Sequence, residues 1–210
     1  KLQKNGVLIA EYLQGKVLQQ QNKYDQALLI YKKLLEKAPW IKDALSGVVE
    51  CYALLNQQAK ARLYLDGLID NHPDIVFPYI VKSQLLAADK KAKQAISFLV
   101  DALEQEKIQN PSVYIELARL YNVIGDVENE GKAYLQGLKI WPKDIALMLH
   151  MASLFENTQV FDKAVSLYEA ILEINPMHGV SKNNLATLLL DFYGEEKDIK
   201  KAVQMVSSFK

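Results

Sequence analysis

A fixed spacing of 34 residues constrains this chain more than any other feature of its sequence. Alanines stand at Ala27, Ala61 and Ala95, and prolines at Pro39 and Pro73 have the same separation. Two residue types that share one period indicate a tandem array, in which each repeat is one supersecondary unit that packs on its neighbours. The period therefore predicts a repeat fold.

Apolar residues within each period recur at intervals of three and four. Residues 7–18 carry one such stripe, and residues 24–35 carry the next. This spacing is typical of amphipathic helices, and no segment shows the alternation that a strand requires. The predicted fold class is all-α, a right-handed superhelix of about six helix–turn–helix repeats. We expect a single array over residues 1–210, with repeats at 8–41, 42–75, 76–110, 111–144, 145–178 and 179–210.

Polar breaks and prolines mark the expected ends of these helices. Small polar side chains between the two helices of a repeat can accept the backbone N–H groups at a helix start, and they are Asn22, Asn56, Asp89, Asp126 and Asn157. Proline excludes helical geometry at the residue before it, so second helices should end before Pro39, Pro73, Pro142 and Pro176. Asn110–Pro111 instead predicts an N-cap followed by proline at the first helical position.

Small residues recur where the two helices of a repeat should approach closely. At the eighth place of five repeats they are Gly15, Ser83, Ala118, Ala152 and Ala186. A large side chain there would overpack the helix pair at a cost of about 1–3 kcal/mol. Val49 departs from this pattern in the second repeat, and Glu130 replaces alanine in the fourth, which predicts looser packing. About four residues are inserted near 193–196 in the sixth.

The residues at these places together resemble the tetratricopeptide repeat family. The best matches are "LQGKVL…YDQALLIYKKLLEKAP" and "LMLHMASLF…FDKAVSLYEAILEINP", and the resemblance covers nearly all of residues 8–210. It implies a protein-interaction scaffold that has no catalysis of its own. The sixth repeat, "NNLATLLLDFYGEEKDIKKAVQMV", is also similar to bacterial arrays of this family linked to exopolysaccharide export and exosortase systems.

The resemblance also implies where a partner would bind. In this family the first helices line the concave side of the superhelix, and partners contact places 2, 5, 9 and 12 of the repeat. Among these we predict a groove formed by Tyr12, Lys16, Glu50, Ile80, Gln84, Ile115, Arg119, Asn122 and Leu149. An apolar strip of Ile80, Ile115 and Leu149 with a polar rim would suit a helix or an extended peptide of a partner. The alternative is that these three side chains pack inside a tight superhelix or under a neighbouring segment.

No group of residues predicts catalysis, a bound metal or a cofactor. His72, His150 and His178 lie in different repeats, and no pair of His or Cys has metal-ligand spacing. Cys51 takes a place that is apolar in the other repeats, so we expect a buried thiol and not a nucleophile. The chain is therefore predicted not to be an enzyme.

Charge and hydropathy favour a protein or peptide as the partner. The 25 Lys and Arg residues balance 25 Asp and Glu residues, so no net field attracts nucleic acid. The apolar runs are too short for membrane insertion, and we expect a soluble protein of the cytoplasm or periplasm. The chain opens on Lys1, which indicates a fragment of a longer chain and leaves a removed targeting segment open.

Two alternatives to groove binding remain open. The array would be an architectural spacer or oligomerisation arm of a larger assembly, such as an envelope or exopolysaccharide-export complex, or a regulatory module attached to an enzyme. The last helix keeps an apolar stripe without a polar cap after it, formed by Ala202, Val203, Val206 and Phe209. Terminal repeats need such a cap, so the stripe predicts further repeats or self-association through the C-terminal helix edge.

Overall fold

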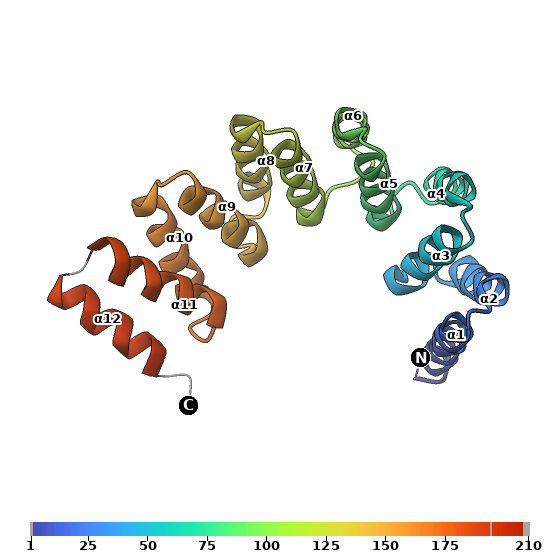
Figure 1. Cartoon of the computed structure of the whole chain (residues 1–210), viewed down its shortest axis with the longest axis horizontal. Coiled ribbons are helices and arrows are strands. Elements are labelled where there is room, and N and C mark those ends of the chain that lie inside the picture. The colour runs from blue at the N-terminus through green and yellow to red at the C-terminus, as the bar shows by residue number, and fades with distance from the viewer. Residues whose placement is uncertain (1, 194, 208–210) are drawn as a thin grey trace. The chain divides into compact units, whose positions relative to one another are not determined.

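The computed structural model describes residues 2–193 and 195–207 and confirms the all-α fold. The described residues form twelve α-helices and one π-helical segment, and they contain no strand (Figure 1). The elements are α1 (Leu2–Gln20), α2 (Tyr24–Lys37), α3 (Lys42–Leu54), α4 (Gln58–Asn71), α5 (Val76–Ala88), α6 (Ala92–Glu104), α7 (Pro111–Val123), α8 (Val127–Ile140), α9 (Ile145–Asn157), α10 (Phe161–Ile174), α11 (Gly179–Leu188), η1 (Leu189–Tyr193) and α12 (Glu196–Ser207).

The helices belong to two compact units, Lys1–Gln109 and Asn110–Lys210. In the first unit each helix from α1 to α6 packs on the next, and α3 also contacts both α1 and α5. In the second unit α7 to α12 pack in the same consecutive way, and α7 contacts α9. The first helices of successive pairs in these contacts therefore lie side by side and form a shared surface.

A residue in the left-handed conformation closes the first helix of five successive pairs. After α1, the N–H of Lys23 donates to the carbonyl of Leu18 at 2.9 Å, and the N–H of Asn22 donates to Gln19 at 3.0 Å. These two bonds form a Schellman motif, which satisfies carbonyls left free at a helix end. The left-handed residues, with φ between 57° and 74°, are Asn22, Asn56, Lys90, Gly125 and Gln159.

The five small polar residues between the helices of a repeat were predicted to cap the second helix, and only Asp126 does so. Its side chain accepts a hydrogen bond from the N–H of Asn129 at 3.1 Å. Asn22 and Asn56 provide the left-handed residue instead, and this puts each of them one position before the N-cap. Asn tolerates that conformation better than most residues, so the prediction was right about the break and wrong about the cap.

The other predicted helix ends agree with the structure. Helices α2, α4, α8 and α10 each end two residues before a proline, as the ring requires. The side chain of Asn110 accepts a hydrogen bond from the N–H of Ser112 at 2.9 Å, and Pro111 follows it at the first helical position.

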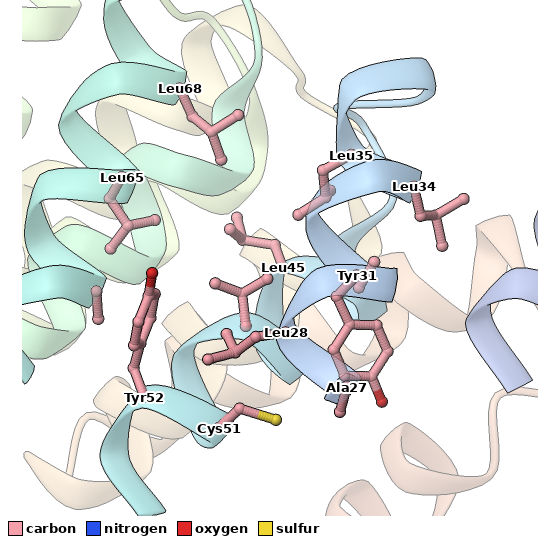
Figure 2. Close-up of a cluster of buried hydrophobic side chains, with 13 residues drawn as sticks. Ala27, Leu28, Tyr31, Leu34, Leu35, Leu45, Cys51, Tyr52, Leu65 and Leu68 are labelled. Atoms are coloured by element: carbon pink, nitrogen blue, oxygen red, sulfur yellow. The ribbon is translucent and has the colours of Figure 1, made fainter. Parts of the chain in front are cut away.

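Close approach of the helices in the first unit depends on glycine. The ring of Tyr31 is fully buried in the cluster shown in Figure 2, beside Ala27 and Leu28. A Cβ added to Gly15 or to Gly47 would lie 2.5 Å from this ring. The tyrosine therefore fills the space that two missing side chains leave. The other small residues predicted at helix contacts are also buried, namely Ser83, Ala118, Ala152 and Ala186.

The fourth repeat packs a carboxylate where other repeats have alanine. Glu130 is only 6% exposed, and it accepts a hydrogen bond from Nδ2 of Asn122 at 3.0 Å. Its neighbours Ala133 and Tyr134 are buried as well. The expected loosening is therefore not seen, because the polar group has a partner inside the helix pair.

The last repeat leaves the regular pattern after α11. This helix continues into η1, which ends at Tyr193, and α12 begins at Glu196, so the insertion predicted near 193–196 falls at the end of η1 and the start of α12. Of the predicted C-terminal stripe, Ala202 is buried and Val203 is exposed. Phe209 and the side chain of Val206 lie outside the described residues.

Candidate partner-binding surfaces

In the first unit, one of the predicted groove residues on α1 and α3, Glu50, is linked to the buried cluster by hydrogen bonds. Glu50 is exposed and accepts a hydrogen bond from Nε2 of Gln19 at 2.8 Å. Gln19 in turn accepts one from the hydroxyl of Tyr31 at 3.0 Å. Tyr12 is half-buried against the ring of Tyr31, whereas Lys16 is exposed. The polar part of this surface is therefore tied to the buried cluster beneath it.

The predicted apolar strip is less exposed than its place in the repeat implied. Ile80 retains 8% exposure, so the alternative in which it packs inside applies to this residue. Gln84, one turn further on α5, is exposed. Ile115 and Leu149, in the second unit, are half-buried. These apolar side chains offer a partner only partial surfaces.

The predicted polar rim of the second unit is engaged by residues of the same unit. The guanidinium of Arg119 donates to the buried carboxylate of Glu116, with Nε–Oε2 at 2.9 Å and Nη2–Oε1 at 2.6 Å. The hydrogen bond to this carboxylate raises the pKa of Arg119. Asn122 donates to Glu130 in the same way. A partner that bound these two side chains would have to share or break existing bonds.

A cavity opens beside the first helices of the second unit, and the predicted groove did not include it. Its volume is about 480 Å³, and it is lined by Glu156, Asn157, Gln159, Phe161, Asn183, Asn184, Thr187, Leu188 and Phe192. Asn183, Thr187 and Glu156 stand at places 5, 9 and 12 of their repeats, where the family resemblance implies partner contacts. These three residues could therefore have been predicted from their places in the repeat.

The shape of this cavity depends on the irregular end of α11. Segment η1 brings the ring of Phe192 onto that of Phe161, with centroids 3.8 Å apart and planes at 21°. Phe192 remains more than half exposed, so the stacked pair forms an accessible apolar wall. The sequence predicted an insertion here, and it gave no sign that the insertion would create this wall.

Polar groups of the cavity are partly occupied and partly available. Nδ2 of Asn184 donates to the hydroxyl of Tyr168 at 3.0 Å, and the hydroxyl of Thr187 donates to the backbone carbonyl of Asn183 at 3.0 Å. Burial raises the pKa of Tyr168 to about 12, so this phenol stays neutral. The side-chain amide of Asn183 has no hydrogen-bond partner among the described residues. A carboxamide both donates and accepts, which matches a peptide group.

Residues considered for other chemistry take structural positions. Cys51 is fully buried, and burial raises the pKa of its thiol to about 11, as expected of a core cysteine. Within residues 2–193 and 195–207, no three His, Cys, Asp or Glu side chains gather as metal ligands would. None of the helices described there has the length and apolar character needed to cross a bilayer.

Comparison with known proteins agrees with the repeat geometry. Residues 18–78 match the family model described as tetratricopeptide repeat. Residues 18–78 are therefore similar to tetratricopeptide repeats. No curated protein sequence matches it.

Solved structures of other proteins share the fold over most of the chain. A thermophilic TPR protein of Thermus thermophilus has 20% identity and a TM-score of 0.60, covering 87% of this chain and 99% of its own. PilF of Pseudomonas aeruginosa has 16% identity and a TM-score of 0.58, covering 97% and 90%. Human IFIT1, solved as a dimer with PPP-AAAA, has 16% identity and a TM-score of 0.54, covering 87% and 46%. At these identities the likeness establishes the solenoid fold alone.

Proposed function

We propose that this tetratricopeptide repeat array is a non-catalytic scaffold that binds an extended peptide of a partner protein along its first helices. The cavity between α9 and α11 is the observation that carries the proposal. Its volume of about 480 Å³ lies within the range of about 300–1,000 Å³ that is common for ligand pockets. It also combines an aromatic wall with polar groups that can fix the orientation of a ligand.

The residues of the cavity suit a peptide main chain better than a charged ligand. Asn183 can pair with a peptide N–H and C=O, and the stacked rings of Phe161 and Phe192 can receive an apolar side chain. Among the described residues that line the cavity, Glu156 is the one charged group, and none offers a basic group for a phosphate. The exposed residues Lys16 and Gln84 of the first unit provide further polar contacts on its own first helices.

An architectural role is the second candidate, and one row of side chains favours it. Ile9, Leu13 and Val17 on α1 are 59%, 53% and 50% exposed. They are four residues apart and therefore form one apolar row along the helix. Such a row suits packing against a helix of another molecule in a larger assembly.

The test compares proteins retained from a lysate of the source cells by three forms of the chain. A variant with Asn183→Arg and Thr187→Arg fills the cavity from two positions of its lining, and Ser166→Arg on α10 adds a positive charge outside it. We expect the native chain and Ser166→Arg to retain the same partner, and the cavity variant to lose it while its helical circular dichroism is unchanged.

Retention of one partner by all three forms, or by none of them, would contradict peptide binding in the cavity. Binding through the exposed row of α1 would then become the leading explanation.

A further inference from the structure

A second groove lies between α2 and α4 of the first unit. Both are second helices of their repeats, whereas the surface proposed to bind a peptide is formed by first helices. The volume of this second groove is about 720 Å³, larger than that of the cavity in the second unit. We refer to it as the α2–α4 groove, and it is lined by Lys32, Leu35, Glu36, Tyr52, Lys60, Leu63, Tyr64, Gly67, Leu68, Asn71 and His72. None of these residues belongs to the surface of the first helices proposed to bind a peptide.

Gly67 is the most informative residue of the α2–α4 groove. Glycine within a helix is less stable than alanine, so its presence calls for a reason. At Gly15 and Gly47 the reason is the ring of Tyr31, 2.5 Å from an added Cβ. At Gly137 a side-chain atom of Leu147 lies at 2.9 Å. At Gly67 nothing lies within 4 Å, so packing within the chain does not require glycine.

The missing side chain instead leaves the wall of the groove open. Glycine is favoured where the backbone of another molecule approaches a helix closely. A groove between two helices is a common receptor for a third, amphipathic helix. The position of Gly67 therefore points to a helix of a partner, because a small ligand could be received without such an approach.

The groove also has apolar and aromatic surface for such a helix. Leu35 is fully buried and Leu68 nearly so, whereas Leu63 is 73% exposed. The ring of Tyr64 is half-buried, and its hydroxyl has no hydrogen-bond partner among the described residues. The side chain of Leu63 is therefore the accessible apolar surface that the groove offers to such a helix.

The charged residues of the groove favour an acidic partner. Lys32 and Lys60 outnumber Glu36, so the lining has an excess of one positive charge with His72 neutral. The ammonium of Lys32 is held 4.9 Å and 5.1 Å from the ring centroids of Tyr52 and Tyr64, and it donates to the Tyr52 hydroxyl. A cation fixed in this way is preorganised to meet a carboxylate.

The neighbouring hollow between α4 and α6 has the opposite balance. Its lining includes three carboxylates and two ammonium groups, from Asp66, Asp70, Asp101, Lys82 and Lys107. The α2–α4 groove therefore attracts an acidic helix, whereas the hollow between α4 and α6 repels it. This repulsion adds to the specificity of the α2–α4 groove for such a helix.

We propose that the α2–α4 groove binds an acidic amphipathic helix of a partner protein. Its backbone approaches Gly67, one of its apolar side chains packs on Leu63, and a carboxylate pairs with Lys32 or Lys60. This site acts independently of peptide binding on the first helices.

The test uses a labelled alanine-based helical peptide with leucine and glutamate one turn apart, and a second peptide with lysine in place of glutamate. Gly67→Leu adds a side chain to the wall of the groove, where nothing lies within 4 Å of its Cβ, and Gly6→Leu is the matched control because nothing lies within 4 Å of the Cβ there either. We expect the acidic peptide to bind the native chain and Gly6→Leu equally, and Gly67→Leu at least about tenfold more weakly. Lys60→Gln should weaken binding about threefold.

Equal binding of the acidic and basic peptides, unchanged affinity in Gly67→Leu, or no binding to the native chain would each overturn the proposal. Equal binding of a proline-interrupted acidic peptide would also overturn it, in favour of an extended segment. A sedimentation difference between the native chain and Gly67→Leu without peptide would identify a second copy as the occupant. The Asn183→Arg, Thr187→Arg variant should bind the acidic peptide normally, so failure of one proposal can be told from failure of the other.

Discussion

The α1–α2 and α7–α8 helix pairs have the same repeat architecture, but different kinds of side chain fill the contact between their two helices. In α1–α2, Gly15 and Ala27 leave room, and the ring of Tyr31 fills it. In α7–α8, the place of Ala27 is taken by Glu130, whose carboxylate is buried and hydrogen-bonded by Asn122. The α1–α2 contact depends on the absence of a side chain at Gly15. The α7–α8 contact depends on the buried carboxylate of Glu130 and its hydrogen bond.

This difference shows what the repeat pattern does and does not determine. The pattern sets the distance between the two helices, and either solution meets it. A missing side chain cannot be replaced without a clash, whereas a buried polar group fails when its partner is removed. The two pairs should therefore respond to different substitutions.

The largest effect is expected from Gly15→Ala, which should lower the free energy of unfolding by about 3 kcal/mol. The new Cβ would lie 2.5 Å from the buried ring of Tyr31, and close-packed surroundings leave the ring little space to move. Denaturant unfolding measures the change. In a Tyr31→Leu background the same substitution should cost much less, and an equal cost in both backgrounds would show that the ring is not the obstacle.

A smaller effect is expected from Asn122→Ala, about 2 kcal/mol, because the buried Glu130 carboxylate would lose its hydrogen-bond donor. The double variant Asn122→Ala, Glu130→Ala should regain most of this stability, since it removes the group that needs the donor. Unfolding measurements on both variants form a double-mutant cycle. If the double variant is as unstable as Asn122→Ala, Asn122 supports the fold by some other contact.

The smallest effect is expected in the titration of two tyrosines. Burial raises the pKa of both Tyr31 and Tyr134 to about 12, and Glu130 adds to the shift of Tyr134. A folded pKa above the unfolded value of about 10 means that the stabilisation is complete below pH 10 and is lost as the pH rises towards 12. Helicity should therefore fall over this alkaline range, as circular dichroism would show.

Glu130→Ala distinguishes the two tyrosines. It should lower the pKa of Tyr134 and leave that of Tyr31 unchanged, as followed by NMR of ring-labelled tyrosine. Equal shifts at both residues, or none at Tyr134, would mean that the carboxylate does not act on the phenol beside it.

Helix positions could be predicted from the sequence because their causes are local. Proline excludes helix before it, so the ends of second helices were predicted to within two residues. The left-handed turns could not be predicted at every repeat, because Lys and Gln have no preference for the left-handed conformation. Lys90 and Gln159 adopt it because the Schellman hydrogen bonds require it.

The candidate sites were less predictable because they depend on contacts between elements. Repeat places identified Asn183 and Thr187, but the aromatic wall beside them comes from the contact of Phe192 in η1 with Phe161. The repeat place predicted close packing at Gly15, but only the surrounding atoms show that Gly67 is open. The link to exopolysaccharide export stays a prediction.

The Schellman turns have a consequence for how such an array can change in length. Each fixes the number of residues between the two helices of a pair, since the bond from Lys23 to Leu18 or from Val160 to Phe155 closes only across that spacing. An insertion inside the turn would break both bonds. After α11 the chain follows η1 instead, next to the insertion predicted near 193–196. The helix pair with its turn is thus the unit that can be duplicated or exchanged as a whole. The length of the connecting segment can vary only where the Schellman hydrogen bonds are absent.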